Sequence, residues 1–213
     1  MKVFSSADLD NMSRFFRANL VNCLTGVKPA LLIGTYSENG VGNLAVFSSV
    51  FHLGADPALI GHVQRPLTEF SHTYRNIISG GAYTLNHVPA SYAAPIHHTS
   101  AKFADGESEF LRCGFREERA EGFAAPFVAE SRLRIGMRFV REIFIPENDT
   151  RLIIGRVELV AVDESLIYGD GNIDLDGNVT TGAGGLETYY RHEAAGKFSY
   201  AKPDTVPVAS TRK

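Results

Sequence analysis

Residues 30–53 read ALLIGTYSENGVGNLAVFSSVFHL, and this stretch decides the fold class. The apolar run at residues 30–36 predicts a buried strand, and residues 37–40 predict a turn because Asn-Gly is the strongest short hairpin signal. A second strand is expected over residues 43–53, and a third over residues 59–63 after the turn at Asp56-Pro57. Strands joined by such short turns predict an antiparallel meander rather than a parallel sheet.

The rest of the chain adds peripheral helices and further strands to this region. Apolar residues at helical spacing predict a first helix that is capped by Ser5 or Ser6 and runs to Leu20. We therefore expect a mainly β protein, an antiparallel barrel with a few peripheral helices, in one domain over residues 1–213 with a loosely held tail from about residue 201. The other expected elements are helices over 67–78 and after Pro89, strands over 82–86, 133–145 and 152–162, and a hairpin turn over 146–149.

The composition excludes several classes of partner. Of 213 residues 44% are hydrophobic, and the formal net charge is −3, so neither nucleic acid nor a membrane surface is expected. No segment reaches the roughly 18 apolar residues of a membrane helix, and no signal peptide is visible. Cys23 and Cys113 lie far apart, which predicts free thiols in a reducing cytoplasm rather than a disulfide framework or a cysteine zinc site.

Some short motifs match ligand sites in spacing but not in context. Residues 40–45 (GVGNLA) follow a turn and precede a strand, whereas the dinucleotide motif needs a strand before it and a helix after it. Residues 172–177 (NIDLDG) start like a calcium loop, but the position of the bidentate glutamate holds Ala183. The histidines form no zinc motif, and no G-x-S-x-G is present. We therefore predict neither a metal site nor a serine hydrolase.

A polar cluster at residues 97–103 (HHTSAKF) is the candidate ligand site. Thr99, Ser100 and Lys102 combine hydroxyl donors with an ammonium group, which suits a phosphate if the stretch forms a turn. Loops are polar by default, so a solvated surface loop is the competing interpretation. Other polar groups that could join the cluster are Ser48 and Ser49, Arg65, and residues 73–76.

Taken together in order, these motifs resemble the flavin reductase-like proteins with the FMN-binding split barrel, which include flavoredoxin and the reductase components of two-component monooxygenases. The resemblance covers roughly residues 28 to 162, and the segment 169–187 and the tail lie outside it. The matching pieces are LIGT (32–35), GNLAVFSS (42–49), QRP (64–66), TYRNI (73–77), GAYTLNH (81–87), HTSAKF (98–103), SEF (108–110), CG (113–114) and PFVAES (126–131).

The resemblance implies a split β-barrel of the antiparallel, Greek-key type that pairs as a homodimer, with one FMN at each subunit interface. It places Asn43 to Ser49 along the isoalloxazine ring, where backbone groups meet the polar edge of the ring. His72 stands where many relatives have an acidic residue. The residues that the resemblance implies as FMN contacts are Asn43, Ala45, Phe47, Ser48, Ser49, Arg65, Thr73, Asn76, His98, Thr99, Ser100 and Lys102.

The activity that the resemblance implies is hydride transfer from NADH or NADPH to the flavin. The flavin carries this chemistry, and the protein supplies orientation and electrostatics, so no catalytic side chain is expected. Reduced flavin then leaves, or electrons pass to a monooxygenase or another acceptor. The alternatives are an FMN-containing electron carrier of the flavoredoxin type without direct NAD(P)H activity, a barrel that binds another phosphorylated ligand such as pyridoxal phosphate, and a structural or partner-binding barrel.

Overall fold

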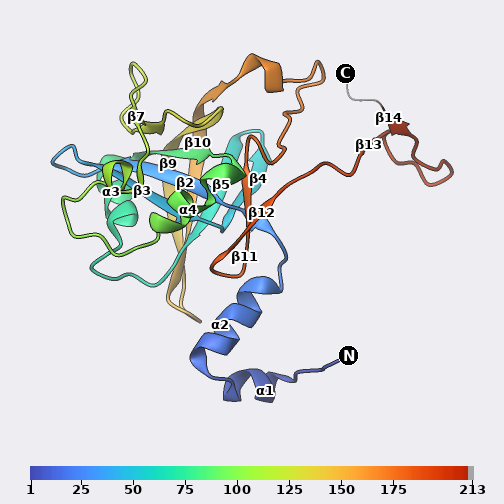
Figure 1. Ribbon diagram of the computed structural model, residues 1–213, viewed down its shortest axis with the longest axis horizontal. Helices are drawn as coiled ribbons and strands as arrows, with labels where there is room; N and C mark the ends of the chain where they lie inside the picture. The colour runs from blue at the N-terminus through green and yellow to red at the C-terminus, as the bar shows by residue number, and fades with distance from the viewer. Residues whose placement is uncertain (211–213) are drawn as a thin grey trace.

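A hairpin forms around the predicted turn in the computed structural model, which describes residues 1–210 (Figure 1). Strands β2 (Leu31–Tyr36) and β3 (Gly42–Phe47) pair antiparallel, with Gly40 at a positive φ of 75° in the turn between them. The single strand expected over residues 43–53 is wrong, because the chain breaks at Ser48-Ser49 and continues as β4 (Val50–Ala55). Local sequence hides this break, since β-forming residues flank it on both sides.

A 7-stranded antiparallel sheet in the order β3-β2-β6-β9-β10-β5-β4 forms the body of the protein. β3 and β4 lie at opposite ends of this order, yet only Ser48 and Ser49 separate them in the chain. The sheet must therefore curl until its edges meet at that corner, while β3 and β4 remain unpaired, which gives a split barrel. The predicted antiparallel pairings are present, β2 with β3 and β4 with β5, but the break at Ser48-Ser49 places β3 and β4 at opposite edges of the sheet, so the strands do not form one continuous meander. The remaining strands of the sheet are β5 (Ala58–Gln64), β6 (Ala82–His87), β9 (Leu133–Ile145) and β10 (Thr150–Val162).

Helix α3 (His72–Gly80) packs on the inner side of the barrel, where Ile77 joins a buried cluster with Leu31 and Tyr83. It starts later than the predicted helix, because residues 67–71 form a turn in which Thr68 N–H donates to Ser71 Oγ at 2.9 Å. It ends as predicted at glycine, where Gly81 takes the left-handed conformation at φ 69°.

A second apolar cluster lies between the outer face of β2–β3 and short helices. Leu32 and Leu44 contribute to it from the sheet, and Ile96 and Phe110 from the helices. The predicted helix after Pro89 is present as a 3₁₀ turn followed by an α-helix. The elements of this region are η1 (Ala90–Tyr92), α4 (Ala93–His98), α5 (Glu109–Cys113), β7 (Glu117–Glu118) and β8 (Phe127–Val128).

The C-terminal part adds two small sheets beside the barrel. A 3-stranded sheet joins the segment before β2 to two late strands, in the order β1-β11-β12. The strands β13 and β14 pair in a hairpin that extends away from the barrel (Figure 1). These elements are β1 (Lys28–Pro29), η2 (Glu164–Leu166), β11 (Thr181–Gly184), β12 (Thr188–Arg191), β13 (Lys197–Phe198) and β14 (Ala209–Ser210).

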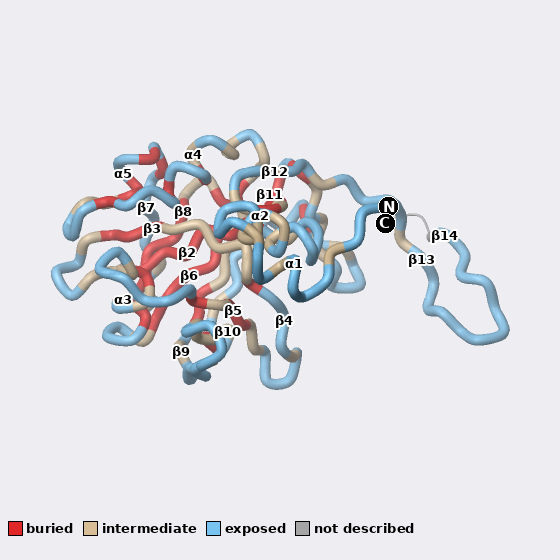
Figure 2. The backbone as a smooth tube through the Cα atoms, turned by 90° about the horizontal axis from the view of Figure 1, so that it is seen from below, coloured by how far each residue is buried: buried red, intermediate tan, exposed pale blue. Residues whose placement is uncertain are grey.

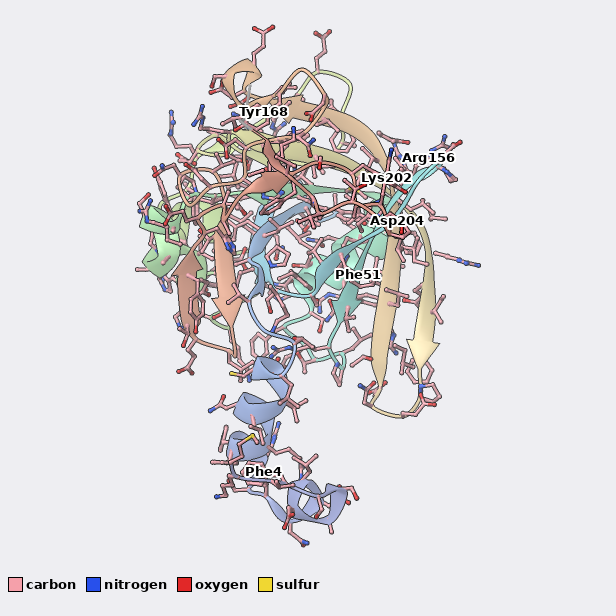
Figure 3. The ribbon with its side chains drawn as sticks, turned by 90° about the vertical axis from the view of Figure 1, so that its right-hand side faces the viewer. Phe4, Phe51, Arg156, Tyr168, Lys202 and Asp204 are labelled. Atoms are coloured by element: carbon pink, nitrogen blue, oxygen red, sulfur yellow. The ribbon has the colours of Figure 1, made fainter. Side chains whose placement is uncertain are left out.

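The chain ends form two arms that leave the barrel. The single helix predicted near the N-terminus is two helices, α1 (Ser6–Asn11) and α2 (Arg14–Cys23), because the backbone at Met12 is extended. Ser5, one of the two predicted caps, forms a capping box with Asp8 at the start of α1. Neither helix buries a residue, and Phe4 stands at the far end of this arm (Figure 3). Figure 2 shows the buried residues concentrated in the barrel and both arms largely exposed. In the predicted tail from about residue 201, residues 201–209 are exposed, and residues 211–213 lie outside the described residues.

No helix of the described part of the chain has the length and apolar character that a membrane crossing requires.

Candidate functional site

The open edge of β3 is the centre of the candidate site. Backbone groups alternate in direction along an antiparallel strand, so those of one residue face β2 and those of the next face away. Leu44 faces away, because its N–H donates to the carboxylate of Glu109 at 3.0 Å instead of to β2. Val46, two residues on, therefore presents its N–H and C=O to the open edge, while the backbone groups of Ala45 and Phe47 face β2.

A buried polar network ties β3 to β2 and α3. Asn43 Nδ2 donates to Thr35 Oγ1 at 3.2 Å and to Thr73 Oγ1 at 2.9 Å, and Asn76 Nδ2 donates to the same Thr35 oxygen at 3.0 Å. All of these side chains are buried. The structure thus brings the predicted residues Asn43, Thr73 and Asn76 together, and the side-chain amides of Asn43 and Asn76 are used inside the protein to hold the start of α3 against β2 and β3.

The N-terminus of α3 presents unsatisfied backbone donors. The helix has no side-chain cap bond and no acidic residue in its first turn. Its N-cap residue Ser71 uses its hydroxyl as an acceptor for Thr68 N–H. The first N–H groups of a helix lack partners within the helix, and together with the helix dipole they favour an anion.

The loop that carries residues 99–105 lies against this helix start. Lys102 Nζ stands 5.1 Å from the centre of the Phe70 ring, just before the helix. Asp105 lies 3.5 Å from the Arg75 guanidinium and 3.9 Å from His72 Nε2. Position 72 itself carries a histidine, and the carboxylate near it comes from the neighbouring loop. The predicted Arg65 is exposed at the beginning of the segment that leads from β5 into α3.

The hydroxyls of the predicted loop residues bond to their own helix. Thr99 Oγ1 donates to Ile96 O at 2.8 Å, and Ser100 Oγ donates to His97 O at 2.7 Å. Thr99 is buried, whereas Ser100 is exposed, so Ser100 keeps its oxygen open to a further partner. The His98 ring packs against Phe103, with ring centres 5.4 Å apart.

The residues at the barrel corner hold the fold together. Ser49 Oγ donates to Val63 O at 3.0 Å and accepts from Val63 N at 3.2 Å, which fastens the corner to β5. Ser48 beside it is half-buried. The Phe47 ring packs inside the barrel, 5.2 Å from the His62 ring. Among residues 1–210, no hydrogen bond, ion pair or ring contact joins these residues to the loop of Lys102, and their role toward a ligand stays a prediction.

Thr35 and Glu109 belong to the site but are not among the residues predicted from the sequence. Both fall within motifs that carry the resemblance, but only the fold shows what they hold. Thr35 is fully buried and accepts from both asparagines of the network. Glu109 is buried, and its desolvation raises the pKa of the carboxyl group, while the bond from Leu44 N–H opposes that shift. No cluster of three or more metal-ligating side chains occurs among residues 1–210.

The comparisons with known proteins identify the family and the fold. A family model described as the flavin reductase like domain matches residues 27–174. A split-barrel protein of the flavin reductase type from Shewanella frigidimarina is 39% identical, with a TM-score of 0.90 over 94% of this chain and 100% of its own. Nitrilotriacetate monooxygenase component B from Bacillus cereus is 25% identical, with a TM-score of 0.80 over 92% and 98%. The Halalkalibacterium halodurans protein BH2278 is 30% identical over 78% of this chain and 82% of its own. The chain belongs to the flavin reductase-like family, and its barrel is the split barrel of that family.

Proposed function

We propose that this protein is a flavin reductase that binds FMN between the open edge of β3 and the N-terminus of α3, and accepts hydride from NADH or NADPH. The observation that carries the proposal is the pairing of an uncapped helix start with an unpaired strand edge, inside a barrel of the flavin reductase-like family. FMN has a phosphate at one end and a ring with alternating donors and acceptors at the other, so it can use both features at once.

The phosphate end fits the start of α3. Backbone N–H groups of the first helical turn would bind it, with Lys102 and Arg65 supplying positive charge and Ser100 a hydroxyl. The Asp105 carboxylate pairs with Arg75 and His72 at the same place. An exposed carboxylate can swing aside, and its pairs are the kind that contribute little to stability.

The ring end fits the edge of β3. The N–H and C=O of Val46 face outward and would pair with an acceptor and a donor on the pyrimidine rim, in the manner of an added strand. Asn43 contributes from inside the barrel by holding β3 to α3. When bound, FMN supplies the hydride acceptor, and the chain orients the ring and stabilises charge at its polar edge.

Substitution in the loop tests the phosphate contact. The double variant Lys102→Ala, Ser100→Ala should weaken FMN binding by about tenfold to a hundredfold, because charge-assisted hydrogen bonds contribute about 1.5–3 kcal/mol. Lys202→Ala is the matched control, since Lys202 is an exposed lysine on the C-terminal hairpin (Figure 3). Fluorescence quenching of FMN during titration measures the dissociation constant. Equal affinity of the double variant and the wild type contradicts the proposed cradle.

Anaerobic spectroscopy tests the activity. The FMN-loaded protein should show an oxidised flavin spectrum that bleaches on addition of NADH or NADPH. Flavoredoxin of Desulfovibrio vulgaris shares the fold at 23% identity. A flavin that only dithionite bleaches would overturn the reductase proposal and favour a flavoredoxin-like electron carrier. Because Bacillus cereus component B is named as part of a monooxygenase, a monooxygenase is the partner class that we propose for the reduced flavin.

We also propose a homodimer with the FMN at the subunit interface, in the cytoplasm. The arms carry exposed apolar side chains, among them Phe15 (80% exposed), Leu24 (68%) and Tyr200 (88%), which a monomer would leave in water. Cys23 and Cys113 are free thiols, as suits a reducing compartment. Light scattering after gel filtration should give twice the monomer mass, and removal of residues 1–24 should lower it to the monomer mass. A monomeric full-length chain contradicts the dimer.

A further inference from the structure

A cavity lies outside the proposed flavin site. It has a volume of about 410 Å³ and is bounded by the end of β6, the segment before β2 and residues 173–194. Its polar wall includes His87, Thr180 and His192, and its apolar wall includes Ile173 and Leu175. None of the predicted FMN contacts lines it. Much of its wall lies beyond residue 174, where the match to the flavin reductase-like family ends.

His87 is the hydrogen-bonding group that this cavity offers. Its Nδ1 lies 2.9 Å from Thr180 Oγ1, and Thr180 is buried. Among the described residues, Nε2 of the same ring has no hydrogen-bond partner. Burial lowers the pKa of His87 to about 4, so the ring is neutral at pH 7 and has one donor and one acceptor nitrogen. The Thr180 hydroxyl can accept from Nδ1 in one tautomer of the ring or donate to Nδ1 in the other. A ligand hydroxyl at Nε2 can likewise donate or accept, so it suits either tautomer.

The charges around the cavity restrict the ligand. The lining includes the carboxylates of Asp174 and Glu193 and the His192 ring, and it includes no lysine or arginine. A phosphate or carboxylate ligand would therefore find no permanently charged cation on the wall and would face the Glu193 carboxylate. Val27, Pro29, Ile173 and Leu175 supply apolar contact surface for a ring or a branched chain.

The cavity lies at the same end of the barrel as the corner after β3. Asn86, next to His87, pairs with Leu32, and the adjacent Leu31 pairs with Phe47. His87 and Phe47 are thus two strand spacings apart, or about 10 Å. A molecule in this cavity would be a neighbour of a flavin on β3 without sharing its contacts.

We infer that this cavity binds a small uncharged alcohol or phenol, with its hydroxyl group hydrogen-bonded to Nε2 of His87 and its apolar body against Ile173 and Leu175. The inference does not depend on FMN, because the lining residues and the proposed flavin residues are separate sets.

The test is a titration with p-cresol, followed by the imidazole C–H resonances of His87 in NMR spectra. Saturable shifts are expected with a dissociation constant on the order of 1 mM, as befits so small a ligand. Benzoate, which has the same ring and a negative charge, should give no saturable shift. The same result is expected with and without bound FMN, so a failure of the flavin proposal leaves this test intact.

Two variants make the test specific. Leu175→Trp should abolish p-cresol binding by filling the cavity, and it should fold because Leu175 is 44% exposed. His87→Phe keeps a ring and should weaken binding by about fivefold to tenfold through loss of one hydrogen bond. His52→Phe is the control, since His52 is exposed on β4 and does not line the cavity. The absence of saturable shifts, or unchanged binding in the Leu175 variant, overturns the inference.

Discussion

Replacing Thr35 by valine tests the polar network that joins β3 to α3. Valine has the shape of threonine without its oxygen, so the change removes one buried acceptor and creates no cavity. Thr35 Oγ1 accepts from Asn76 Nδ2 at 3.0 Å and from Asn43 Nδ2 at 3.2 Å. Asn43 keeps Thr73 as a partner for its amide group, whereas Asn76 Nδ2 is left buried without an acceptor.

The magnitude follows from these contacts. A buried donor without a partner costs about 1–3 kcal/mol, and the lost second bond costs about 0.5–1 kcal/mol. The extra methyl group offsets up to about 1 kcal/mol. We therefore expect the free energy of unfolding to fall by about 2 kcal/mol in Thr35→Val.

Urea denaturation followed by circular dichroism measures this change. Thr188→Val is the matched control, because Thr188 is exposed on β12 and should change stability by no more than about 0.5 kcal/mol. Thr35→Ser keeps the acceptor and should lose less stability than Thr35→Val. A loss below about 0.5 kcal/mol in Thr35→Val, or a larger loss in the serine variant, would refute the network as a stabilising element.

Other single substitutions test the packing of the barrel. Gly34→Ala should lower the free energy of unfolding by about 3 kcal/mol in thermal unfolding, because a Cβ there would collide with the carbonyl oxygen of Pro126. Gly80→Ala is the control, because a Cβ at Gly80 meets open space and causes no clash. Glu109→Ala should cost about 1–3 kcal/mol in urea, since it leaves an amide at the edge of β3 without its acceptor; a neutral variant would contradict that role. Burial lowers the pKa of His62 from 6.5 to about 3, so the unfolded chain binds more protons between these values and the native state loses stability as the pH falls. His62→Phe should therefore remove about 2 kcal/mol of the stability lost between pH 7.5 and pH 5, and an unchanged pH profile would show that this histidine is not buried as described.

The local sequence pattern predicts a strand well where turn-forming residues mark the ends of that strand. The long strand β9 (Leu133–Ile145) has the predicted bounds, and β10 (Thr150–Val162) starts only two residues early, because a polar turn separates two long runs of strand-forming residues. The break between β3 and β4 at Ser48-Ser49 is not marked by turn-forming residues. It is set by the Ser49 contacts with Val63 on another strand, and contacts distant in sequence cannot be seen in a window of neighbouring residues.

The candidate site also depends on contacts that the local sequence does not show. Residue type identifies Ser100 and Lys102 as groups that can bind a phosphate, but it does not show which hydroxyls the protein already uses. Thr99 is buried and bonded to its own helix. Likewise, Glu109 is not among the predicted ligand groups, and only the fold places its carboxylate on the edge of β3.

The open edge of β3 is proposed to receive the FMN ring, and the amide of Val46 reports on this contact directly. In ¹H–¹⁵N spectra of the labelled protein, saturation with FMN should move the Val46 amide proton downfield and slow its exchange with solvent, while the Ala45 amide, bonded to β2, should move much less. FMN that binds with full occupancy and leaves the Val46 amide unchanged would contradict the account.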